Sequence, residues 1–195
     1  MEYQIDYFRY RTFLFSADEI KRNNVVGAIA ELGVYRGVFA SLIREAFPKR
    51  KFYLFDTFEG FSCEESKIEF EKGRCTKEFI ERYKVTSKDV VLQKLKNRDN
   101  LIFCKGLFPD SVSAEAAEEK YAFVSLDVDF ETSTYEGLQF FYPRLSENGM
   151  IFIHDYNSSH LHGVKEAIAK YELDEGIIMK KIPLADICGT CVIIK

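Results

Sequence analysis

Short apolar runs alternate with amphipathic stretches along most of the chain, and this alternation limits the fold more than any other feature. Nearly continuous apolar runs are typical of strands that are covered on both faces of a sheet. They occur at Val25–Leu32, Phe52–Phe55, Leu101–Cys104, Phe123–Leu126, Met150–Ile153, Ile177–Ile182 and Cys191–Ile194. The sequence therefore predicts a sheet of seven strands.

Between the earlier runs lie stretches with the spacing of amphipathic helices. They are Val38–Ala46, Lys88–Lys96, Ser111–Lys120, Tyr135–Leu145 and Val164–Tyr171. This order predicts an α/β fold whose mostly parallel sheet has helices on both faces. Only Gly189 and its neighbours separate the last two runs, which suggests an antiparallel hairpin at the C-terminal edge.

We expect a single domain, because 195 residues, of which 47% are hydrophobic, suffice for one core and are few for two. Residues 1–24 are predicted to form a helical cap, with the helix over Tyr3–Asn23. The long charged segment 59–100 is expected to be a lid or insert over a pocket, and a solvated surface helix is the alternative.

Charge and composition exclude several classes of partner. A net charge of -4 and the lack of a basic run make nucleic acid an unexpected ligand. The apolar runs are far shorter than the roughly 20 residues that span a bilayer. The start, "MEYQIDYFRYR", is typical of neither a signal nor a transit peptide, so we expect a cytoplasmic protein without a membrane partner. Five cysteines, an odd number, fit reduced thiols.

The first strand ends in a glycine turn, and in a parallel sheet ligands bind beyond the carboxyl ends of the strands. In "AELGVYRGVFASLI", Glu31, Gly33 and Gly37 form an E-x-G-x-x-x-G turn that opens into a helix. Asp56 follows the second strand, where an acid can accept the hydroxyls of a ribose. A nucleoside site is therefore predicted. The alternative is an ordinary tight turn with Asp56 as a loop cap.

The turn is unsuited to a dinucleotide, which needs G-x-G-x-x-G. Leu32, Tyr35 and Arg36 interrupt that pattern. Glu31 would repel a pyrophosphate, whereas it suits a ligand that carries an ammonium group. S-adenosylmethionine is such a ligand.

Several linked motifs, spread over roughly residues 28 to 172, carry a resemblance to a known family. They are "AELGVYRG", "LFDTFEGF", "KGLFPDSV", "LDVDFETST", "FFYPRLSENGMIFIHDY" and "GVKEAIAKY". In their order and spacing the chain resembles the macrocin-type (TylF-like) O-methyltransferases, which methylate sugar hydroxyls of macrolides and related glycosides. Those enzymes carry extra N-terminal structure that helps to form the oligomer and the acceptor pocket.

The resemblance implies a Rossmann-like class I fold with S-adenosylmethionine as the cofactor. It places Glu31 and the Gly33 loop near the methionine part of the cofactor and Asp56 on the ribose. The loop Lys105–Ser111 would pass near the adenine, where Phe108 either stacks on the purine or packs against the next helix. The full predicted set of cofactor contacts is Glu31, Gly33, Tyr35, Arg36, Gly37, Asp56, Gly106, Phe108, Ser111 and Asp127.

Two strands end in acids, at Asp127 and Asp129 and again at His154 and Asp155. In the implied fold these strands are neighbours, so the acids should converge and repel unless a proton or cation is shared. By the resemblance, Asp127 and Asp155 match ligands of Mg²⁺, and His154 stands where the family has an acid. We predict a divalent metal, Mg²⁺ or Mn²⁺, held by Asp127, His154 and Asp155; the nitrogen ligand leaves its identity open. The alternatives are a helix cap for Asp129 and a structural hydrogen bond for His154.

The predicted function is methyl transfer from S-adenosylmethionine to a hydroxyl of a sugar, a glycoside or another small polyhydroxylated molecule. The catalytic base is Asp127 or Asp129, and metal assistance is expected. An inactive nucleoside-binding module and a nicotinamide-dependent oxidoreductase remain as alternatives, and a homo-oligomer is left open. The C-x-x-C pair of Cys188 and Cys191 lacks the further ligands of a zinc site and the helix N-terminus of a redox pair, so neither role is favoured and the role of the pair is left open.

Overall fold

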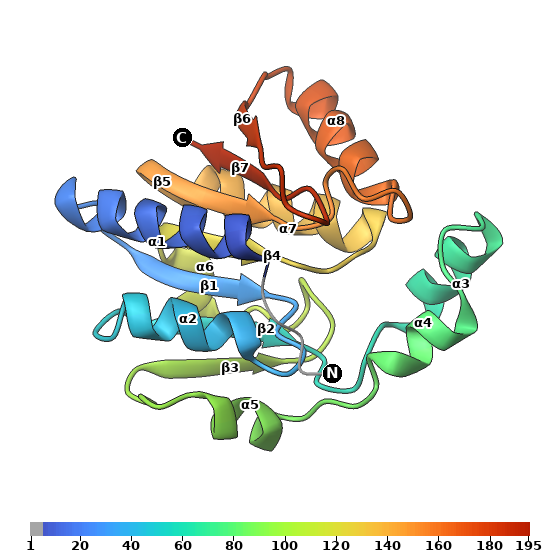
Figure 1. Ribbon diagram of the computed structural model, residues 1–195, viewed down its shortest axis with the longest axis horizontal. Coiled ribbons are helices and arrows are strands. Elements are labelled where there is room, and N and C mark those ends of the chain that lie inside the picture. Colours follow the sequence, from blue (N-terminus) through green and yellow to red (C-terminus); the bar gives the residue numbers. More distant parts are fainter. Residues whose placement is uncertain (1–5) are drawn as a thin grey trace.

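The computed structural model describes residues 6–195, which are built around one seven-stranded sheet (Figure 1). The strand order is β3-β2-β1-β4-β5-β7-β6. The strands are β1 (Ala28–Leu32), β2 (Phe52–Asp56), β3 (Leu101–Lys105), β4 (Tyr121–Leu126), β5 (Leu145–Ile153), β6 (Lys180–Pro183) and β7 (Cys191–Ile194). Only the pairings of β7 with β5 and β6 are antiparallel, so within this range the predicted parallel sheet with an antiparallel C-terminal edge is confirmed.

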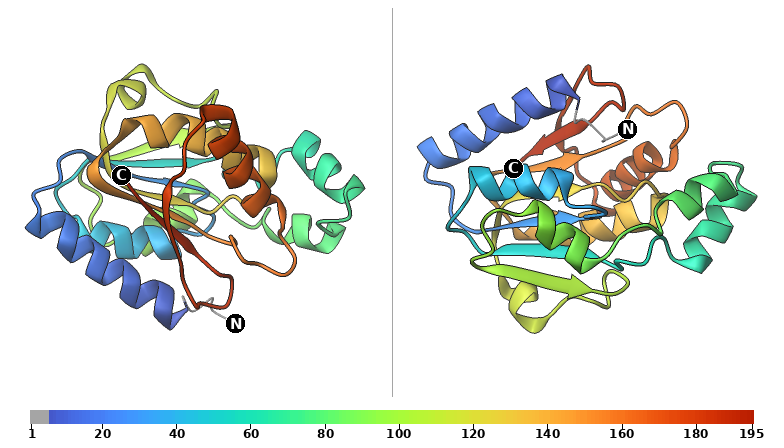
Figure 2. Two further views of the ribbon diagram at one scale, coloured as in Figure 1. Left: turned by 90° about the horizontal axis from the view of Figure 1, so that it is seen from above. Right: turned by 60° about the horizontal axis from the view of Figure 1, so that its bottom comes forward.

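Helices cover both faces of the sheet, as Figure 2 shows. They are α1 (Tyr7–Arg22), α2 (Val38–Ala46), α3 (Cys63–Glu71), α4 (Lys77–Arg82), α5 (Lys88–Lys94), α6 (Ala114–Glu118), α7 (Glu131–Arg144) and α8 (Gly163–Glu175). Helices α1, α2 and α5 bury apolar side chains in one core cluster. Helices α6, α7 and α8 do so in the other. Because helices bury both faces of the sheet, successive residues of a strand are buried whichever face they point to, which explains the continuous apolar runs.

Several predicted boundaries were wrong. The first strand begins at Ala28 instead of Val25, because Gly27 turns the chain there with a φ of +123° and lies against Lys120. The fifth strand begins at Leu145, well before Met150. The sixth begins at Lys180, since α8 runs to Glu175 and Gly176 ends it in the left-handed conformation. The other helices differ from their predicted ranges by up to a few residues at either end.

The predicted N-terminal helix is present as α1, and residues 3–5 of its predicted range lie outside the described part. The Asp6 carboxylate accepts the backbone N–H groups of Phe8 and Arg9 and so caps the helix. Phe13, Ala17 and Ile20 follow at helical spacing and are buried against the sheet. Within residues 6–195, no helix has the length and apolar character needed to cross a bilayer.

The structure divides the predicted lid or insert, residues 59–100, into two parts. Helices α3 and α4 project beyond the carboxyl ends of the strands, apart from the helices that cover the sheet (Figure 1). Helix α5 belongs to the body instead, because Val91 is fully buried in the core cluster beneath α1 and α2. The role of the projecting part as a lid stays a prediction.

The sheet register brings the polar strand ends together. The chain order reverses between β1 and β4, which is where parallel α/β sheets bind ligands. Leu32 is aligned with Leu126, and Leu126 with Ile153. The residues that follow each of them, Gly33, Asp127 and His154, therefore leave the sheet side by side.

Candidate active site

A cavity of about 1450 Å³ lies at this edge of the sheet. The ends of β1, β2, β4 and β5, the loop after β3 and the projecting helices all contribute to its wall. Its volume exceeds the roughly 300–1,000 Å³ of ordinary small-molecule pockets. The cavity therefore has room for two ligands side by side.

The glycine loop after β1 is held tightly against its neighbours. Gly33 has a φ of +84°, and a Cβ built on it would lie 1.9 Å from the carbonyl oxygen of Asp127. Any side chain at this position would clash with backbone. The Oδ2 atom of Asp56 accepts the N–H groups of Val34 and Tyr35 at 2.7 and 2.8 Å, which fixes the loop to the end of β2.

The Asp56 carboxylate accepts more hydrogen bonds from the protein itself than the sequence suggested. Its Oδ1 atom accepts the N–H group of Phe58 at 2.7 Å. A carboxylate offers about four acceptor positions, so these three bonds leave about one for a ligand. Burial raises the pKa of Asp56, and the three N–H groups oppose that shift. The contact of Asp56 with a ribose stays a prediction, and the geometry favours one hydroxyl over two.

Glu31 is a buried acid without a complete set of partners. It is 2% exposed, and its Oε2 atom has no hydrogen-bond partner among residues 6–195. Burial, and next the charge of Asp127, raise the pKa of Glu31 well above its usual range. A ligand cation near Oε2 would provide the missing interaction, which suits the predicted ammonium contact.

The acids at the ends of β4 and β5 do converge. Asp127, Asp129 and Asp155 each offer a carboxylate oxygen, and these atoms lie within 4.8 Å of one another. Burial, and next the charges of Asp155 and Asp127, raise the pKa of Asp129 well above its usual range. Helix α7 begins at Glu131 without a side-chain cap, so Asp129 has no capping role. The cluster is instead an oxygen donor set under mutual repulsion.

A chain of charged groups crosses this cluster. Asp127 lies 3.1 Å from the Nη2 atom of Arg9 on one side and 3.1 Å from the Nδ1 atom of His154 on the other. His154 Nδ1 also lies 2.7 Å from Oδ2 of Asp155. Burial acts to raise the pKa of Asp127. The charges of His154 and Arg9 outweigh that effect and hold this pKa well below its usual range. At His154, burial acts to lower the pKa of the imidazole. The charge of Asp127 outweighs that effect and raises this pKa well above its ordinary value.

Arg9 is the site residue that the sequence reasoning missed. It lies on the buried face of α1 in line with Phe13 and Ala17, and its guanidinium carbon is 4.3 Å from the centre of the Phe39 ring. An arginine in the apolar stripe of an amphipathic helix was the available signal, because such a charge needs a buried partner. That partner is Asp127, 118 residues away in sequence.

The remaining predicted contacts divide into two groups. Tyr35, Arg36, Gly106 and Phe108 line the cavity with Glu31, Gly33, Asp56 and Asp127. Gly37 and Ser111 are not among the described residues that line the cavity, so their contact with a cofactor stays a prediction. Gly37 faces helix α5, where a Cβ would lie 2.9 Å from Val91.

Phe108 packs against β2 and α7, and neither of these is the next helix along the chain, α6. Its stacking on a purine stays a prediction. Its ring centre lies 5.5 Å from that of Phe55 and 5.8 Å from that of Phe141, to which it is stacked. The same side chain also lines the cavity. An aromatic group held from behind in this way presents a fixed surface to a ligand.

Ionic contacts tie the projecting helices to the body. Arg74 pairs with Glu131 at 2.7 Å and with Glu166, and Lys72 also pairs with Glu131 at 2.7 Å. The Glu65 carboxylate accepts the N–H and hydroxyl of Ser133 at 2.8 and 2.6 Å. These contacts join two segments of the cavity wall, since α3 and the start of α7 both contribute to it.

Comparison with known proteins agrees with this geometry. Several O-methyltransferases of known structure share the fold of this chain. The O-methyltransferase NovP has a TM-score of 0.74 at 20% identity, over 96% of this chain and 79% of that one. The calicheamicin methyltransferase CalS11 has a TM-score of 0.69 at 21% identity, over 94% and 79%. At these identities the likeness concerns the fold alone.

The sequence identifies the family. The family model described as macrocin-O-methyltransferase (TylF) matches residues 6–195, so the chain belongs to this family. It is also similar to the mycinamicin III 3''-O-methyltransferase of Micromonospora griseorubida, at 28% identity over 169 residues. That match covers 80% of this chain and 64% of the relative, so the chain spans less than two thirds of that protein's length.

Proposed function

We propose that this protein transfers a methyl group from S-adenosylmethionine to a hydroxyl of a sugar, a glycoside or another small polyhydroxylated molecule. The observation that carries this proposal is the single cavity that joins two unlike ends. The cofactor end comprises Glu31, the Gly33 loop and Asp56. The acid end comprises Asp127, Asp129, His154 and Asp155. Family membership and the fold support the same reaction class.

The cofactor end fits S-adenosylmethionine. The unpartnered Oε2 atom of buried Glu31 suits the ammonium group, and Asp56 keeps about one acceptor position for a ribose hydroxyl. At Gly33 the loop passes too close to the backbone of Asp127 to carry a side chain, so this part of the cavity wall is backbone. When bound, the cofactor supplies a methyl group that its sulfonium already activates.

The acid end fits a divalent cation. Asp127, Asp129 and Asp155 present oxygens close enough together to share one ion, and oxygen is the donor that Mg²⁺ and Mn²⁺ prefer. We propose that Asp127 and Asp155 hold the ion and that His154 or Asp129 completes the set. Such an ion would lower the pKa of a hydroxyl bound beside it. A nitrogen ligand would shift preference from Mg²⁺ toward Mn²⁺.

The side chains of the acid end have separable tasks in this scheme. Arg9 and His154 hold Asp127 from two sides, so its carboxylate stays ionised and oriented toward the cavity. As an ionised acceptor, Asp127 can take the proton of the attacking hydroxyl, and Asp129 is the second candidate for that role. The projecting helices exclude water and align the acceptor for in-line attack.

Cofactor binding and turnover are tested separately. We expect S-adenosylhomocysteine to bind and to raise the melting temperature, whereas NAD should do neither. Methyl transfer to a panel of glycosides, assayed with added Mg²⁺ or Mn²⁺ and with excess chelator, then tests the reaction and its metal. Binding without turnover on any acceptor would favour a nucleoside-binding module. Full activity in chelator would remove the metal and leave Asp127 or Asp129 as a plain base.

A further inference from the structure

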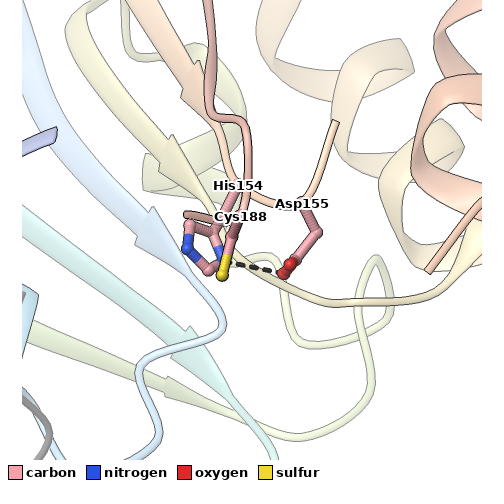
Figure 3. A group of neighbouring side chains, drawn as sticks. All are labelled: His154, Asp155 and Cys188. Carbon is pink, nitrogen blue, oxygen red and sulfur yellow. Dashed lines mark hydrogen bonds and ion pairs between the residues drawn. The ribbon is translucent and has the colours of Figure 1, made fainter. Parts of the chain in front are cut away.

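A thiol lies on the side of the acid end that the proposed reaction does not use. Cys188, His154 and Asp155 each offer one ligand atom, and the three atoms lie within 4.8 Å of one another (Figure 3). This set provides sulfur, nitrogen and oxygen. It therefore differs in chemistry from the all-oxygen set of Asp127, Asp129 and Asp155.

The turn that carries Cys188 is anchored on both sides. Before it, Asp186 accepts the N–H and the hydroxyl of Thr190, both at 2.6 Å, which closes the turn across the cysteine. After it, the carbonyl oxygen of Gly189 accepts the N–H group of Asn157 at 3.1 Å. These bonds hold the thiol against the segment that follows β5, where His154 and Asp155 lie.

Gly189 makes this close approach possible. Its φ is +66°, and a Cβ built on it would lie 2.5 Å from the Cβ of Asn157. A residue with a side chain would push the turn away from β5. The backbone next to Cys188 is thus shaped for contact with the segment that supplies the other two ligand atoms.

We propose that His154, Asp155 and Cys188 form a second metal site, which binds Zn²⁺ in preference to Mg²⁺. Thiolate and imidazole are ligands that zinc favours and magnesium avoids. Zinc bonds of about 2.0–2.3 Å in a tetrahedron put ligand atoms about 3.3–3.8 Å apart, so small side-chain rotations suffice to assemble the site. Three protein ligands leave a fourth position open toward the cavity.

Asp155 belongs to both sets, and this makes the two sites interdependent. A zinc ion on Cys188 draws on a carboxylate that the all-oxygen set also needs, and it places two positive charges next to that set. Zinc bound there therefore weakens binding of a second divalent cation at Asp127 and Asp129. The zinc site itself requires no methyl transfer, so it stands or falls independently of the proposed function.

Cobalt(II) is the probe for sulfur ligation, because a cobalt-bound thiolate gives a charge-transfer band in the near ultraviolet. We expect the full chain to show this band and Cys188→Ser to lose it. Zinc affinity, measured by competition with a chromophoric chelator, should fall by more than about tenfold in Cys188→Ser, since even groups outside the ligand shell contribute about 10–100-fold. Cys63 is an exposed thiol on α3, and Cys63→Ser should change neither the cobalt band nor the zinc affinity.

A crossed pair of variants separates the two sites. Cys188→Ser should weaken zinc more than it weakens Mn²⁺, which is followed by electron paramagnetic resonance. Asp127→Asn should weaken Mn²⁺ and leave the zinc affinity within a few-fold. The proposal is overturned if the parent lacks the cobalt–sulfur band, or if Cys188→Ser keeps the zinc affinity of the parent. Equal loss of both ions in Cys188→Ser would also overturn it, because the cysteine would then only support the turn.

Discussion

The two ends of the cavity are held in place by different kinds of contact. At the cofactor end, backbone N–H groups bind Asp56 over a separation of 22 residues or fewer. At the acid end, Asp127 is bound by charged side chains, one of them 118 residues away in sequence. The first end is a local motif, whereas the second is complete only after α1 has packed on the sheet. If the ends also have different tasks, single substitutions should separate binding from turnover.

The largest effect is expected for Asp127→Asn. This change keeps the shape of the side chain but removes the charge that accepts a proton or binds a cation. Turnover should fall by about 10²–10⁴-fold, the usual contribution of a general base, while S-adenosylhomocysteine affinity stays within a few-fold. Methyl transfer and calorimetric titration measure the two. Asp18→Asn on the exposed face of α1 is the control. A parallel loss of affinity would show that the two ends are not separable.

Asp56→Ala should have the opposite signature. It removes the one charge-assisted hydrogen bond expected with the ribose, which contributes about 1.5–3 kcal/mol, so S-adenosylhomocysteine should bind roughly 10–150-fold more weakly. The melting temperature of the free protein should fall too, because the Gly33 loop loses its fastening to β2. If Asp56→Ala binds as tightly as the parent, the cofactor does not occupy this end of the cavity.

Arg9→Met tests the contact between Arg9 and Asp127, and we expect an effect of intermediate size. The methionine keeps apolar contact with Phe39 but leaves Asp127 with one cationic partner. We expect kcat to fall by about tenfold, as befits the loss of one hydrogen bond between charged groups, with cofactor affinity unchanged. Arg9→Lys should recover part of the loss. Arg22→Met, at the exposed end of the same helix, should have no effect. An unchanged kcat would mean that Arg9 only stabilises the packing of α1.

This comparison also explains what could be predicted from the sequence. The sheet, its antiparallel edge and the convergence of Asp127, Asp129 and Asp155 follow from apolar periodicity and from the rule for parallel strands. The glycine loop and Asp56 lie within one strand–helix–strand unit, so their spacing is visible along the chain.

Arg9 and Cys188 could not be placed in the same way. Each reaches the acid end through packing between segments that are distant in sequence. Boundaries such as that of β5 failed for a related reason, since strand pairing with β4 extends to Leu145, beyond the apolar run. Local patterns therefore predicted the glycine loop, Asp56 and the three converging acids, whereas Arg9 and Cys188 join the acid end through tertiary contacts.

The smallest expected effect concerns the junction between the projecting helices and the body. Glu131 pairs with Lys72 and Arg74, and these side chains are partly exposed, so the pairs contribute at most about 1 kcal/mol. Glu131→Gln should therefore leave kcat and S-adenosylhomocysteine affinity unchanged, raise KM for the acceptor by a few-fold, and speed amide hydrogen exchange within residues 63–82.

Ionic strength provides the check on that prediction. Salt screens ion pairs that are exposed to this degree. A higher salt concentration should therefore speed amide hydrogen exchange in the parent, and it should have less effect on Glu131→Gln, which has already lost the carboxylate charge. Glu81→Gln, which removes an exposed pair with Lys84 inside the projecting part, should not change the acceptor KM. Equal exchange in the parent and Glu131→Gln would mean that the bonds of Glu65 to Ser133 and the pair of Arg74 with Glu166 hold the helices without Glu131. The charge on Glu131 would then have no part in positioning the acceptor, and the only charged contact whose loss is expected to lower turnover would be the one between Arg9 and Asp127.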